Sequence, residues 1–278
     1  MKDYNKFRKY ETNLDYFKSW SPKMAYILGF ITADGYIKDD GKSYALMISL
    51  SQKDLPLLQF IQSEISPNCP IKLFERKTEL NNLSKMAKLS ISSKEIVKDL
   101  GKLQVFGQKS GREKYPNVPK EFIGDYLRGF LDGDGCISNT SNCLSIIYVC
   151  TNREYLEKLQ NCVDGLGNIY IRKTRIGNPL FVWQISAQKD VEKFKNIIYY
   201  PNHPFALKRK LDKIKDFKVR VKPPLYEYRH KHNSFIFSRC AHCDIIFSHP
   251  YKSKNSFCSQ DCKFKWRKIH ASSKMHIT

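Results

Sequence analysis

One segment occurs twice in this sequence, and the repeat constrains the possible fold more than any other feature. The first copy is AYILGFITADGYI at residues 25–37, and the second is DYLRGFLDGDGCI at residues 125–137. Each copy is an apolar helical pattern that ends in a small residue followed by Asp-Gly. A repeat at a domain-sized spacing predicts one structural unit used twice.

The patterns downstream of each copy also correspond. Residues 43–51 and 143–151 alternate in the manner of strands, and helical patterns follow at 55–65 and 155–166. The remaining expected elements are strands at 71–73, 89–92, 169–171 and 183–186, and helices at 94–103 and 189–199. The chain is therefore predicted to be α+β, with two halves that share the order αββαββα.

The repeat also sets the expected domain boundaries. An N-terminal extension at 1–20 precedes a first half at 21–119 and a second half at 120–217. A basic linker at 218–236, which contains Pro223-Pro224, then leads to a cysteine-rich module at 237–278.

Small residues in the repeated helices predict an unusually close packing. Gly29 and Ala33 are four residues apart, as are Gly129 and Gly133, so each helix has one face nearly free of side chains. Two such faces allow the helix backbones to approach almost to contact.

This crossing would place Asp34 and Asp134 side by side at the two helix C-termini. Two nearby carboxylates repel each other, and the negative helix ends add to the repulsion. A divalent cation such as Mg²⁺ or Mn²⁺ relieves it, and metal ions of this kind can assist phosphodiester cleavage. The alternative is that each Asp merely ends a helix before a glycine turn.

The net charge indicates a polyanionic partner. The chain has 48 Lys+Arg against 27 Asp+Glu, a formal net charge of +21. Neutralising phosphates releases condensed counterions from nucleic acid, whereas a merely solvated basic surface would only repel itself. The excess is concentrated at residues 201–278, which hold 18 Lys+Arg and 5 Asp+Glu.

Hydropathy gives no indication of a membrane segment. No apolar run reaches the roughly 18 residues that a spanning helix needs, and the first 20 residues lack the apolar stretch of a signal peptide. We therefore expect a soluble intracellular protein.

The two repeated segments resemble the signature of the LAGLIDADG homing endonucleases, in the single-chain form with two motifs. The likeness covers about residues 20–215. It implies a monomer with two pseudo-twofold-related halves, which form a saddle of two antiparallel sheets on double-stranded DNA with the motif helices at its centre. It also implies site-specific cleavage of both strands, with Mg²⁺ bound by the last acid of each motif. Those acids are Asp34 and Asp134, and the backbone carbonyls of Ala33 and Gly133 are the further candidate ligands.

The first motif departs from the family pattern at one position. The sixth residue is usually acidic, and it is Asp132 in the second copy but Thr32 in the first. Because this is not the metal-binding acid, we expect little loss of activity, although the two sites become unequal.

Family members also carry a basic residue near each metal site. Lys109 lies in a segment that resembles the Gly-x-Lys-Ser stretch before the second motif, and Lys210 lies in a basic stretch after the last helix. We favour Lys210 over Lys208. Either lysine would stabilise the pentacoordinate phosphate or polarise the attacking water, and the alternative for each is a solvated or phosphate-binding side chain.

Side chains on the sheet face away from the helices are expected to enter the major groove of the DNA. An exposed polar face is the alternative. The candidates are Lys72, Arg76, Lys88 and Ser90 in the first half, and Tyr170, Arg172, Arg175 and Gln184 in the second.

The C-terminal module carries four cysteines with metal-ligand spacing. Cys240 and Cys243 form a Cys-x2-Cys pair, and Cys258 and Cys262 form a Cys-x3-Cys pair fourteen residues later. Four thiolates suit a closed structural Zn²⁺ site in a zinc-ribbon or treble-clef-like module that ends in a helix. Free thiols are one alternative, and His242 or His249 in place of one of the cysteines is another. We expect the module to add DNA contacts, with protein docking as the second interpretation.

Three functions are compatible with this fold. The first is a homing endonuclease, encoded in an intron or free-standing. The second is an intron maturase that binds intron RNA, and the third is a DNA-binding regulator that does not cut. Retention of both motif acids favours the enzyme.

Overall fold

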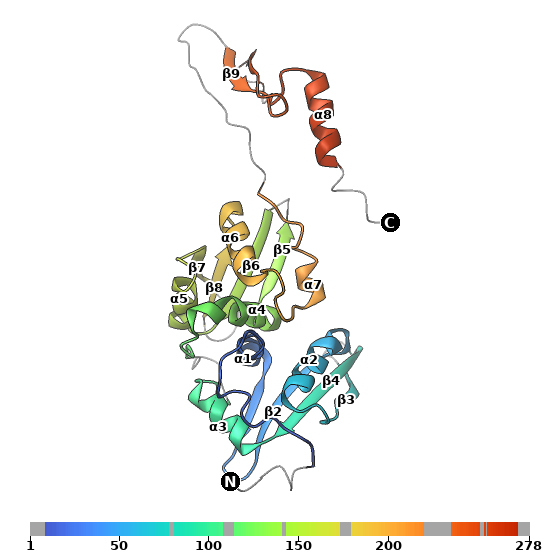
Figure 1. The fold of residues 1–278 in the computed structure, drawn as a ribbon, viewed down its shortest axis with the longest axis vertical. Helices are drawn as coiled ribbons and strands as arrows, with labels where there is room; N and C mark the ends of the chain where they lie inside the picture. The colour runs from blue at the N-terminus through green and yellow to red at the C-terminus, as the bar shows by residue number, and fades with distance from the viewer. Residues whose placement is uncertain are drawn as a thin grey trace. The chain divides into compact units, whose positions relative to one another are not determined.

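A computed structural model describes residues 9–77, 81–107, 114–140, 143–172, 179–219, 235–250, 253 and 255–271. Two compact units are present, Met1–Lys218 and Val219–Thr278. In the first unit, the predicted α+β fold with the order αββαββα in each half is confirmed (Figure 1). The second unit is described separately below.

The first half begins at α1 (Pro22–Asp34). The side-chain hydroxyl of Ser21 caps this helix by accepting the backbone N–H of Met24 at 3.1 Å. The sheet order is β1-β2-β4-β3, and all of its strand pairs are antiparallel. The other elements are β1 (Tyr36–Asp39), β2 (Tyr44–Ser51), the 3-10 turn η2 (Gln52–Asp54), α2 (Leu55–Ile65), β3 (Lys72–Lys77), β4 (Leu83–Ser92) and α3 (Lys94–Lys102).

The second half has the same topology, with the sheet order β5-β6-β8-β7. A short helix, α7 (Lys208–Leu211), follows its last long helix. Its elements are the 3-10 turn η3 (Lys120–Phe122), α4 (Ile123–Asp134), β5 (Cys136–Thr140), β6 (Cys143–Cys150), α5 (Arg153–Asn161), β7 (Asn168–Arg172), β8 (Leu180–Ile185) and α6 (Gln188–Ile198).

Helices α1 and α4 pack against each other between the two sheets (Figure 1). A methyl carbon on Gly29 would overlap the carbonyl oxygen of Tyr126, and one on Gly129 would overlap that of Tyr26. These two contacts involve equivalent positions of the repeat. The helix backbones therefore touch, as the glycine spacing predicts.

Helix α1 is buried along most of its length. Every residue from Met24 to Thr32 is buried, which is typical of a helix inside a core rather than on a surface. The inner faces of both sheets complete this core, with Leu46 and Ile48 in the first half and Tyr148 and Trp183 in the second.

Several element boundaries differ from the sequence prediction. The helix expected at 155–166 ends at Asn161, because Asp164, Gly165 and Gly167 adopt left-handed φ values of 55°, 71° and 76°. In the first half, β3 and β4 are longer than expected. All six residues of β3 are exposed, so its sequence lacks the apolar alternation that marks a half-buried strand.

The second unit contains a hairpin and a helix. Strand β9 (Phe235–Arg239) pairs antiparallel with β10 (Ile246–Pro250), and α8 spans Gln260–Ala271. The buried Ser238 hydroxyl lies 2.8 Å from Nε2 of His249, which joins the two strands.

Among the described residues, no helix is both long and apolar enough to cross a membrane.

The backbone contact between α1 and α4 generates a stability prediction. Gly129→Ala should lower the free energy of unfolding by about 1–3 kcal/mol, because the added methyl group forces the helices apart. Gly101→Ala is the matched control, since its methyl group would lie 3.5 Å from the Phe106 ring. Alanine should be neutral or stabilising there, by up to about 1 kcal/mol. Urea unfolding measures both, and a Gly129→Ala protein as stable as the native one would contradict the described crossing.

Candidate active site

Asp34 and Asp134 are the last residues of α1 and α4, and both side chains are exposed. The N–H groups of Gly35 and Gly135 donate to the carbonyls of Ile31 and Leu131, at 2.9 and 3.0 Å. Each helix therefore stays regular up to its acid. The chain then becomes extended and enters β1 or β5, so the two acids occupy equivalent positions.

The two helix ends lie against each other. The Ala33 side chain fills the space beside Gly133, and Asp34 Oδ2 is 3.6 Å from where a Cβ at Gly133 would stand. The Asp34 carboxylate is thus next to the residue that precedes Asp134. The four residues predicted to bind the catalytic metal share one end of the helix pair, and carboxylate and carbonyl oxygens are donors that suit Mg²⁺.

The sixth motif positions pair with tyrosines across the helix interface. Tyr26 Oη donates to Asp132 Oδ2 at 2.7 Å, and at the equivalent place Tyr126 Oη donates to Thr32 Oγ1 at 3.3 Å. Thr32 therefore preserves the hydrogen bond in the first copy, but without a charge. The difference between the two motifs is therefore buried, two residues before Asp34 and Asp134.

Asp132, unlike Thr32, carries a carboxyl group, and this group makes a second hydrogen bond. Its Oδ2 also accepts the backbone N–H of Leu207 at 2.8 Å, while Oδ1 has no hydrogen-bond partner among the described residues. Burial raises the pKa of Asp132, although the bonds from Leu207 and Tyr26 oppose the shift. Asp132 thereby links α1 of the first half to the segment that carries Lys210.

Lys210 is buried at the C-terminal end of α4. Its Nζ donates to the carbonyls of Leu131 and Asp132, the latter at 2.9 Å, and to those of Gly133 and Gly135 at 3.3 and 2.8 Å. Burial lowers the pKa of Lys210 to about 8, against the opposing charges of Asp132 and Asp34.

The ammonium group of Lys210 supplies hydrogen-bond donors to the carbonyls at the end of α4. Its positive charge also offsets the negative partial charge at this helix end, which carries Asp134. Lys208, by contrast, is exposed on the same short helix. A direct contact of Lys210 with the scissile phosphate stays a prediction.

The segment around α7 also joins the two halves. Arg209 forms a two-pronged ion pair with Asp54 of the first half, at 3.0 and 2.9 Å, and Phe205 stacks on Phe60 at 4.7 Å between ring centroids. The fully buried guanidinium of Arg128 donates to the Phe205 carbonyl at 2.6 Å. These contacts hold the lysine-bearing segment at the helix crossing.

Two of the predicted site residues, Lys109 and Arg175, lie outside the described residues. Gly107, which ends the described part of that segment, lies against β1: a Cβ there would be 2.5 Å from the Ile37 carbonyl oxygen.

In the first half, the candidate DNA-reading residues share one face of the sheet. Lys72 pairs with Lys88 and Arg76 pairs with Ser84 across β3 and β4, while Ser90 pairs with Met47 of β2. The intervening β4 residues Ala87, Leu89 and Ile91 are buried and point to the core. This outer face is cationic and rich in hydroxyl groups.

The corresponding face of the second half is more apolar. Tyr170 and Gln184 share it, and Tyr170 Oη donates to Gln184 Oε1 at 2.8 Å. Arg172 stands on the same face, two residues beyond Tyr170. Val149 and Val182 pair at the centre of this face, where Val149 is half-buried and Val182 is buried. The outer faces of the two sheets therefore differ in composition.

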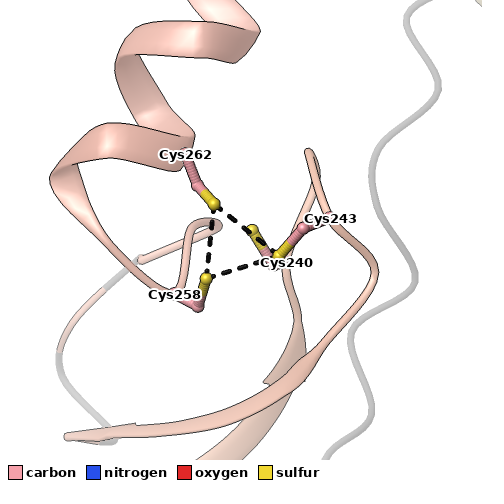
Figure 2. Close-up of side chains that lie close together, drawn as sticks. All are labelled: Cys240, Cys243, Cys258 and Cys262. Carbon is pink, nitrogen blue, oxygen red and sulfur yellow. Dashed lines mark hydrogen bonds between the residues drawn. The ribbon is translucent and has the colours of Figure 1, made fainter.

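The four cysteines of the second unit come together (Figure 2). Cys240 and Cys243 lie at the turn between β9 and β10, while Cys258 precedes α8 and Cys262 lies in its first turn. Their sulfur atoms all lie within 4.8 Å of one another, and three pairs are 3.5–3.6 Å apart.

This spacing fits a tetrahedral Zn²⁺ site. Zn–S bonds of about 2.3 Å place the sulfurs of such a site about 3.8 Å apart. Burial would raise the pKa of the Cys240 thiol, but hydrogen bonds from the backbone N–H groups of Cys258 and Cys243 outweigh it and lower the pKa to about 6. The backbone therefore favours a thiolate at Cys240.

Solved structures with a similar fold include LAGLIDADG proteins. The homing endonuclease I-WcaI bound to its DNA recognition sequence is 20% identical, with a TM-score of 0.50, over 74% of this chain and 92% of that one. Mesophilic variants of the homing endonuclease I-DmoI are 19% identical, with a TM-score of 0.45, over 72% and 97%. The N-terminal LAGLIDADG domain of DUF199/WhiA is 18% identical, with a TM-score of 0.44, over 73% and 92%.

A search of curated proteins finds no match. The family described as LAGLIDADG-like domain matches residues 21–66 and 121–199, which include both helix ends described above. Through these two segments, the chain is a member of the LAGLIDADG family.

Proposed function

We propose that this protein is a sequence-specific endonuclease that cuts both strands of DNA, as a monomer. The carrying observation is the juxtaposition of Asp34 with Gly133, the residue before Asp134, at the ends of two helices in backbone contact. The net charge of +21 supports a nucleic-acid substrate. The structural similarity to I-WcaI, a homing endonuclease bound to its DNA recognition sequence, supports the same substrate class.

In this proposal, Asp34 and Asp134 hold Mg²⁺ or Mn²⁺, with the carbonyls of Ala33 and Gly133 as further oxygen donors. The bound ion supplies activation of water and stabilisation of the charge that develops on the phosphate. The protein's part is to keep the two carboxylates in place. The glycine-mediated crossing does so, because neither helix end can shift without separating backbones that are already in contact.

The two lysines have different proposed roles. Lys210 is proposed to act indirectly: its buried positive charge lies against the carbonyls at the end of α4 and offsets the negative partial charge there. Lys109 is the proposed counterpart of the first motif and stabilises the phosphate directly. Because Asp132 and Thr32 also differ, we propose that the two strands are cut at unequal rates.

The outer faces of the two sheets are the proposed DNA-reading surfaces. The first half offers cations and hydroxyls for phosphates and base edges, including Lys72 and Lys88. The second offers Tyr170 and Gln184, with apolar contacts to thymine methyl groups. An asymmetric target sequence follows from this difference. The proposed biological role is intron homing, in which a single site must be recognised.

The first test replaces one carboxylate oxygen. Asp134→Asn should abolish double-strand cleavage in Mg²⁺, by at least about a hundredfold, while DNA affinity changes little. Asp34→Asn should do the same or leave nicking of one strand. Gel analysis of nicked and linear plasmid, with the target first selected from a randomised library, measures the outcome.

Asp216→Asn is the matched control, because it removes a carboxylate from the same unit outside the motif helices. Its cleavage should equal that of the native protein. Full cleavage by Asp134→Asn would overturn the proposed mechanism. Native protein that binds but never cuts DNA would favour the regulator, and selective binding of intron RNA would favour the maturase.

We further propose a structural Zn²⁺ ion held by Cys240, Cys243, Cys258 and Cys262. Elemental analysis of the full chain should find one zinc, and Cys258→Ser should lose it because three thiolates do not close a tetrahedral site. Cys136→Ser is the control, since this exposed thiol lies in the first unit. Equal zinc content in native protein and Cys258→Ser would contradict the assignment.

A further inference from the structure

The last helix of the zinc module has two chemically different sides. On one side, Cys262 points to the other three cysteines (Figure 2). Trp266, one turn later, lies 5.6 Å from the Phe257 ring and stacks on His270 with centroids 4.2 Å apart. Sulfur and ring contacts thus fix this side of α8 to its own module.

The other side of α8 carries cations. Lys263 and Arg267 are four residues apart, so they are neighbours on the helix surface, about 5–6 Å apart. Neither forms an ion pair within the part of the chain that the structure describes, whereas Lys265 pairs with Asp261 at 2.7 Å. Phe264, between the two cations in sequence, is 68% exposed.

The charge identifies the kind of partner that fits this surface. Residues 219–278 contain 12 Lys+Arg against 3 Asp+Glu, so the whole unit is electropositive. A polyanion gains from contact with such a helix by releasing its counterions. Duplex DNA is favoured because its major groove, about 12 Å wide, admits an α-helix, and because an exposed aromatic ring can contact thymine methyl groups there.

We propose that the zinc module docks on duplex DNA through the face of α8 formed by Lys263, Phe264, Arg267 and Lys268. The proposal rests on the proposed DNA substrate of the first unit, whose target it extends to flanking base pairs. The four-cysteine site has a positioning role, because Cys262 belongs to both the site and α8 and so fixes the rotation of the helix about its own axis. Contacts of this kind add affinity and length to the bound site, while the cleavage position is set elsewhere.

The test uses the full chain with the double substitution Lys263→Gln and Arg267→Gln. Binding to one long mixed-sequence duplex is measured as a function of salt. The double variant should bind about tenfold more weakly at physiological salt, and its log–log salt slope should fall by nearly two, because each phosphate contact contributes about 0.9. Hydroxyl-radical footprinting should show a protected segment that is shorter at one end.

Lys265→Gln is the matched control, because it removes the same charge from the same helix at an ion-paired position. Its salt slope should fall by less than one, and every variant must retain one zinc per chain. A double variant with native affinity, slope and footprint would overturn the proposal. The exposed apolar face of Phe237 and Ile246 on the hairpin would then be the better candidate, as a protein-docking surface.

A cleavage assay on the native protein and the double variant distinguishes failure of this proposal from failure of the proposed endonuclease function. If the native protein cuts DNA and the double variant cuts at the same position with a shorter footprint, both proposals stand. If the native protein binds without cutting, the proposed activity fails, yet the change in slope still tests the role of α8.

Discussion

The rest of the structure depends on the contact between the backbones of α1 and α4. Gly29 and Gly129 leave room for the carbonyls of Tyr126 and Tyr26, and the exchange is reciprocal between equivalent positions. Such a contact fixes both the distance and the rotation of the helices, since any shift brings a side chain against a carbonyl. The positions of Asp34 and Asp134, at the ends of these helices, are fixed by the same contact. A site that must hold two mutually repelling carboxylates gains from a scaffold with so little freedom to separate them.

Within the described residues, the second half contributes more of the charged side chains near the helix ends than the first half does. Asp132 reaches both Tyr26 and the Leu207 backbone, and Lys210 binds the carbonyls at the end of α4. Arg209 then ties the same segment to Asp54 of the first half. The lysine, the buried acid and the inter-half ion pair form one connected network. Asp132 and Lys210 are buried in this network, and removing the partners of either would leave a buried charge uncompensated.

The fold and the convergence of the two motif helix ends were accessible from sequence because both depend on local patterns. Helix periodicity, strand alternation and Gly spacing each reflect contacts that recur at fixed intervals, and duplication reports the same pattern twice. The four cysteines were similarly predictable, since ligand spacing within a short module is a local property. Strand β3 was partly missed for the converse reason. Its side chains are all exposed, so backbone pairing with β4 alone keeps it extended.

Contacts over long sequence separations were inaccessible. The sequence singles out Lys210 as basic and near the site, but its four carbonyl partners belong to a helix end some 75 residues earlier. Nothing local indicates that this lysine is buried or that its pKa falls to about 8. Nor does the local sequence indicate that Asp132 of α4 contacts the segment that carries the lysine. The same limit explains the contrast between Asp132 and Thr32. In sequence the change looks like a minor departure from a motif. In the structure both residues accept a tyrosine hydroxyl, and Asp132 also accepts the backbone N–H of Leu207, in the segment that carries Lys210. Asymmetry in this protein therefore arises two residues before the helix ends, where one motif has a buried carboxylate in contact with the lysine-bearing segment and the other has a neutral hydroxyl.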